Sequence, residues 1–168
     1  MEFNWWEGLV AGALATVAMT ALMQMGAAMG MTRMSMALML GSMFRRDPES
    51  ARALGMTLHF MNGLAFGVLY ALVWWAIDPA DLADAWWIGL VFGAVHGVVA
   101  MAMMPVMSGM HPRVRRDALA VSEGPGSELR LPPFGFGGRG FGSMTPMGIL
   151  LGHLVFGVVW GIVFWWLA

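Results

Sequence analysis

The segment Gly152–Trp166 has the sequence GHLVFGVVWGIVFWW and decides the fold. It is apolar apart from one histidine, His153, which is followed at steps of four residues by Gly157 and Gly161. Steps of four keep residues on one face of an α-helix, so the segment predicts a helix with an imidazole beside a groove of missing side chains. The same spacing occurs in three residues of another apolar run: His59, Gly63 and Gly67.

Four long runs of the chain are apolar and free of charged residues. Each exceeds the roughly 20 residues that an α-helix needs to cross about 30 Å of hydrocarbon. Charged residues make up only 11% of the 168 residues, whereas soluble domains contain roughly 25%. We therefore expect one domain, 1–168, with four transmembrane helices over about 5–31, 48–77, 85–107 and 146–167.

The basic residues predict how these helices are oriented. All nine are arginines, and all lie in or beside the segments 32–47 and 108–145. Because basic loops stay on the cytoplasmic side, we expect both segments to be cytoplasmic loops of a multi-pass protein in the inner (cytoplasmic) membrane, with both termini outside. Tryptophan pairs then anchor the outer ends of the helices; they begin at Trp5, Trp74, Trp86 and Trp165.

The two halves of the chain resemble one another. WWEGLVAGALATVAM from Trp5 and WWIGLVFGAVHGVVAM from Trp86 carry GLV and then G-A at the same positions. The second and fourth helices share the H-x3-G-x3-G spacing described above. We therefore expect an all-α fold in which two tandem, parallel-repeat hairpins form one four-helix bundle.

Three histidines within the predicted spans are candidate functional residues, because ionisable groups inside a membrane are costly. His59 and His153 are expected at one depth and facing each other, as the axial ligands of a haem b for which Gly63, Gly67, Gly157 and Gly161 make room. Metal handling is a second interpretation, with His59, His153 and His96 as ligands and methionine thioethers that select copper. A proton relay through the three histidines is a third.

A purely structural interpretation stands beside these three. Each histidine would then hydrogen-bond across helices and so fix the bundle. Cysteine is absent, and the sequence contains no nucleophile–base pair and no phosphate-binding loop, so we do not expect an enzyme. In the loops, we expect Met34–Phe44 to be amphipathic and to lie in the membrane interface, Ser108–Ser143 to be irregular, and His111 to be solvated.

The segments HGVVAMAMMPVM and MTPMGILLGHLVFGVVWG resemble a family of small, uncharacterised four-helix membrane proteins of bacteria and haloarchaea. In that family a Thr-Pro pair leads into a G-H-L-x-x-G helix near the C-terminus. The resemblance implies the four-helix arrangement and the matching residues His153, Gly157 and Gly161. It implies no activity.

These observations predict a non-catalytic integral membrane protein that acts as an accessory or scaffolding subunit of a larger membrane assembly. Its intramembrane histidines would be structural or would ligate a cofactor such as haem b. The alternative is a small transporter or carrier for a metal ion such as copper, or for another small solute. Expected partners are membrane lipid and other membrane subunits or a homo-oligomer, and not nucleic acid.

Overall fold

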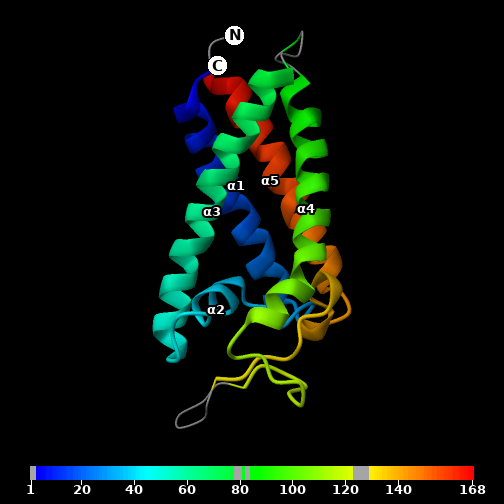
Figure 1. Cartoon of the computed structure of the whole chain (residues 1–168). Helices are drawn as coiled ribbons and strands as arrows, with labels where there is room; N and C mark the ends of the chain where they lie inside the picture. Colours follow the sequence, from blue (N-terminus) through cyan, green and yellow to red (C-terminus); the bar gives the residue numbers. More distant parts are fainter. Residues whose placement is uncertain (1–2, 78–80, 82–83, 123–128) are drawn as a thin grey trace. The chain divides into compact units, whose positions relative to one another are not determined.

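The computed structural model describes residues 3–77, 81, 84–122 and 129–168. Those residues form helices and two isolated β-bridges, without an extended strand. Among them, four helices are long and apolar enough to cross a membrane (Figure 1): α1 (Trp5–Ala28), α3 (Pro48–Ile77), α4 (Ala85–Met110) and α5 (Thr145–Leu167). The predicted all-α membrane protein with four transmembrane helices is therefore confirmed.

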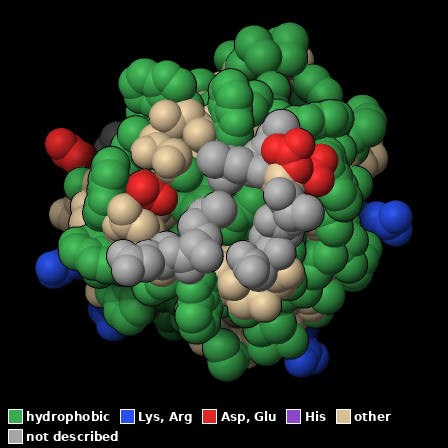
Figure 2. Space-filling model, turned by 90° about the horizontal axis from the view of Figure 1, so that it is seen from above, with side chains coloured by type: hydrophobic (Ala, Val, Ile, Leu, Met, Phe, Trp, Pro, Cys, Tyr) green, Lys and Arg blue, Asp and Glu red, His purple; other side chains and the backbone are tan. Residues whose placement is uncertain are grey.

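The helix bounds follow local signals in the sequence. α3 begins at Pro48, after Asp47 accepts a hydrogen bond from the Ser50 backbone N–H at 2.8 Å, as an N-cap does. α1 ends three residues before the expected position 31, and α4 continues three residues beyond the expected position 107. Many exposed side chains of these helices are large and hydrophobic, as lipid requires. Figure 2, which views the molecule end-on from above, shows mostly hydrophobic side chains at that end.

The described chain packs as two compact units, and the single domain expected from its length stays a prediction. Unit 1 contains Met1–Met23, Phe60–Val98 and Leu150–Ala168, and unit 2 contains Gln24–His59 and Val99–Ile149. Each of the four long helices contributes residues to both units. The boundary between the two sets of residues therefore lies within each long helix and does not separate one helix from another.

In unit 1 the helices approach each other where glycines remove side chains. A Cβ added to Gly12 of α1 would lie 2.7 Å from the Gly63 carbonyl oxygen of α3, which is closer than real Cβ contacts. On the other pair of helices, a Cβ on Gly157 of α5 would meet the Gly89 backbone of α4, and one on Gly93 would meet the His153 carbonyl. These glycines allow the close backbone approach that stabilises membrane helix pairs.

Unit 2 contains a short helix, α2 (Met36–Gly41), that the sequence did not predict as a packed element. Its N-cap is Ser35, whose hydroxyl accepts a hydrogen bond from the Leu38 N–H at 3.2 Å. Gly41 of α2 and Gly55 of α3 face each other so closely that a Cβ on either would overlap backbone atoms of the other element. The segment expected to lie in the membrane interface is thus largely buried within the protein.

The second long loop also folds into unit 2. Its tract after Pro133 is irregular, as expected, with a 3-10 segment η2 (Phe136–Phe141). Phe134 and Phe141 are nevertheless fully buried, with ring centroids 5.3 Å apart. Gly137 has a φ of 60°, and a Cβ there would lie 2.9 Å from Pro146. Glycine is required at this turn by both its conformation and its neighbour.

Candidate functional site

Three polar side chains from three helices meet inside unit 1. The Tyr70 hydroxyl on α3 hydrogen-bonds with His96 Nδ1 on α4 at 3.1 Å. The ring of His96 lies edge-on to that of His153 on α5, with centroids 4.5 Å apart. Tyr70 and His153 are buried, and His96 is partly buried. The structure thus brings together two of the three histidines that the sequence singled out.

The glycines of α4 place these two histidines side by side. A Cβ on Gly93 would meet the backbone carbonyl of His153, and a Cβ on Gly97 would lie 3.1 Å from the His153 Cβ. The backbone of α5 at His153 therefore fills the groove that the missing side chains leave in α4. His96 lies between these two glycines in the sequence, so close helix contact brings its ring to His153.

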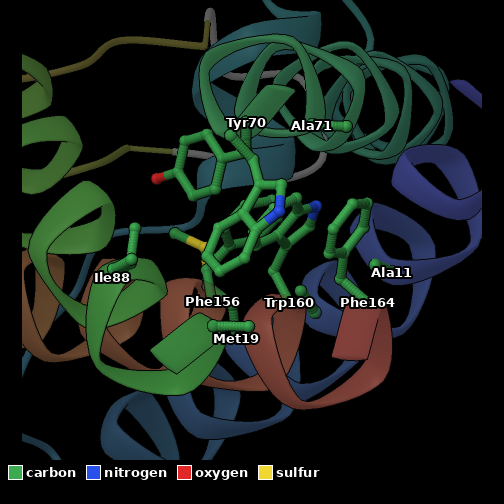
Figure 3. Close-up of a cluster of buried hydrophobic side chains, with 11 residues drawn as sticks. Ala11, Met19, Tyr70, Ala71, Ile88, Phe156, Trp160 and Phe164 are labelled. Atoms are coloured by element: carbon green, nitrogen blue, oxygen red, sulfur yellow. The ribbon is translucent and has the colours of Figure 1, made fainter. Parts of the chain in front are cut away.

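Aromatic side chains surround the polar cluster. Phe66 stacks on His96 with centroids 3.8 Å apart, and Phe156 meets Tyr70 edge-on at 5.6 Å. The cluster continues through Trp160, which contacts Tyr70 at 5.4 Å and stacks on Phe164 at 4.7 Å (Figure 3). The Trp160 Nε1–H donates to the Gly67 carbonyl at 3.0 Å. The polar groups are therefore enclosed by a closely packed, mostly aromatic core.

This arrangement joins three helices and contains few side chains that could bind a ligand. Two neighbouring imidazoles and a phenol hold α3, α4 and α5 together by hydrogen bonding and ring contact. Among the described residues, no group of three or more His, Cys, Asp or Glu side chains is placed to hold a metal ion. Sequence reasoning missed Tyr70, although it is the single tyrosine of the chain and lies in an apolar span, which was the available signal.

The remaining predicted site residues lie elsewhere. His59 is on α3 in unit 2 and is partly buried, and its pairing with His153 stays a prediction. The space beside the predicted cofactor glycines is occupied by neighbouring helices: Thr16 at Gly63, Gly12 at Gly67, Gly89 at Gly157 and Ala85 at Gly161. These contacts give the glycines a packing role and add no support to haem ligation.

The fourth histidine, His111, was expected to be solvated, and this prediction is wrong. His111 is only 5% exposed. Both of its ring nitrogens have partners: Nε2 hydrogen-bonds with the Met39 carbonyl at 2.9 Å, and Nδ1 accepts the Arg113 backbone N–H at 3.1 Å. Burial lowers the pKa of His111 below 6.5; the bond to Met39 opposes this shift, and the charge of Arg113 adds to it. The neutral imidazole therefore ties the end of α4 to α2.

A family model covers residues 4–120 of this chain, which is most of its length. The chain belongs to the family of unknown function DUF6789. The part that matches DUF6789 includes α1 to α4, with Tyr70 and His96, and ends before α5 and His153. Comparisons with curated proteins and with solved structures find no match.

Proposed function

We propose that this member of DUF6789 is a non-catalytic integral membrane protein that acts as an accessory or scaffolding subunit of a larger membrane assembly. The observation that carries the proposal is the filled interior of unit 1. Side chains from all four long helices form one buried hydrophobic cluster that extends from Ala11 to Phe164. A closed, closely packed core suits a protein that presents fixed outer surfaces to partners.

In this proposal the histidines are structural. His96 and His153 have each other and Tyr70 as neighbours, and the glycines beside His153 contact backbone. The matching contacts of α1 with α3 and of α4 with α5 also support the tandem repeat, because both pairs meet through glycines. The arginines support an orientation in the inner membrane with both termini outside and both arginine-bearing loops in the cytoplasm.

The proposal is tested on the tagged full chain, extracted from its native membrane in polymer-bounded lipid discs. We expect it in a particle with other membrane subunits at fixed stoichiometry, and with no visible absorbance and no bound metal even from cells supplied with haem and copper. A Soret band lost in both His59→Ala and His153→Ala, but retained in His96→Ala, would show haem ligation by the first two histidines instead.

A small carrier is the second candidate function. It is favoured by the contact of three polar side chains, Tyr70, His96 and His153, inside a membrane span, because such groups mark solute and proton paths in transporters. Purified protein in liposomes distinguishes the two functions. Copper uptake that is lost in both His96→Ala and His153→Ala would support the carrier and overturn the accessory role.

A further inference from the structure

Asn62 is an exposed amide in the middle of a transmembrane helix. It is the fifteenth of the 30 residues of α3, and its side chain is exposed. Trp75, at the end of the same helix, is 13 residues away, which corresponds to about 20 Å at 1.5 Å per residue. The amide therefore lies well inside the hydrocarbon. Among the residues that the structure describes, none hydrogen-bonds with Asn62.

Other exposed polar side chains of the transmembrane helices either hydrogen-bond within their own helix or lie near the membrane interface, whereas Asn62 does neither. The Thr57 hydroxyl donates a hydrogen bond to the Ala53 carbonyl of the same helix at 3.2 Å. Gln24 lies four residues before the end of α1, within reach of the membrane interface. The outward faces of α4 and α5 carry aliphatic side chains such as Val95 and Ile162. An amide at the depth of Asn62 is costly in lipid unless another helix supplies a partner.

We propose that the outward face of α3 at Asn62 is the interface between two copies of this chain. A second copy inserted with the same orientation carries its own Asn62 at the same depth. A side-chain amide has both a donor and an acceptor, so two of them satisfy each other reciprocally across a twofold axis. A different protein would need a complementary polar group at this same depth.

The residues beyond Asn62 suit such a contact. Exposed residues follow at alternating steps of three and four along α3, in the spacing of left-handed membrane helix pairs: Ala65, Leu69, Leu72 and Ala76. The small side chain of Ala65, one turn from Asn62, lets the two α3 helices approach closely enough for the amides to meet. This inference goes beyond the accessory role and does not depend on it.

Cysteine cross-linking tests the interface, because the chain has no cysteine of its own. Ala65→Cys in the full chain, reconstituted alone in liposomes and oxidised, is expected to give a band at twice the 18.2 kDa of the chain. The matched control is Val95→Cys, an exposed position of α4 that lies at similar depth, nine residues from Trp86. It is expected to stay monomeric. Equal cross-linking of the two variants would refute the interface.

Substitution of Asn62 provides the second arm. Asn62→Leu should weaken dimerisation, measured by energy transfer between labelled copies in liposomes, about tenfold, as expected for the loss of two interhelical hydrogen bonds. Its thermal stability as a monomer should not fall, since leucine suits lipid, and this excludes misfolding. Asn62→Gln should retain dimers. Unchanged dimerisation of Asn62→Leu would overturn the proposal. So would cross-linking of Ala65→Cys in the native membrane only to a different protein.

Discussion

The contact between α1 and α3 at Gly12 makes a quantitative prediction about stability. A Cβ at Gly12 would lie 2.7 Å from the Gly63 carbonyl oxygen, whereas ordinary contacts begin at 3.4 Å. The two backbones must therefore separate by 3.4 − 2.7 = 0.7 Å to admit alanine. Overpacking of this kind costs about 1–3 kcal/mol. Gly12→Ala also gains up to about 1 kcal/mol in helix propensity, which partly hides that cost.

Gly26 of the same helix is the matched control. A Cβ at Gly26 meets nothing within 4 Å, so Gly26→Ala keeps the propensity gain without the separation of helices. The gain is common to both variants, and their difference in free energy of unfolding should therefore be about 1–3 kcal/mol in favour of Gly26→Ala. Detergent-induced unfolding, followed by tryptophan fluorescence, measures it. Equal stability of the two variants would refute the packing of α1 on α3.

Three further predictions concern orientation, pH and the polar cluster. A cysteine placed at Leu119, which is 88% exposed in its loop, should resist an impermeant thiol reagent in intact cells and react after permeabilisation; labelling in intact cells would reverse the orientation. The unfolded chain protonates His111 more readily than the folded chain does, so stability should be fully present above pH 6.5 and fall as the pH drops below it. His111→Gln should weaken that pH dependence, and a stability that rises with acid would contradict the buried neutral imidazole. Tyr70→Phe should cost about 0.6 kcal/mol in the wild type and nothing in a His96→Ala background, and equal costs in both would show that the hydroxyl does not act through His96.

The long helices follow directly from the sequence, because lipid imposes a single requirement on every spanning segment. A run of apolar residues of sufficient length has to be helical, and turn signals such as Asp47-Pro48 set where it begins. The spacing of the glycines by steps of four also defines a helix face without reference to any partner, and that face is where Gly157 of α5 meets α4.

Which helix packs against each of these helix faces could not be predicted in the same way. His153 meets His96 because of how α4 and α5 are rotated about their axes, and the spacing of one helix contains no information on the rotation of another. The contacts of the loop residues were even harder to predict. Their buried contacts, such as Ser42 with His111 or Thr32 with Thr145, join residues 69 and 113 positions apart, and no periodicity reports such pairs.

The glycine contacts of unit 1 also set an order of assembly during synthesis. The partners of Gly8 and Gly12 on α3 end at Ala71, so the first pair of helices is complete once about 77 residues have been inserted. The partners of Gly89 and Gly93 lie on α5, which is synthesised after α4, so this contact forms later than the contact of α1 with α3. The bundle is therefore built from its N-terminal pair, and a nascent chain held after α4 would lack the α5 side of the second contact.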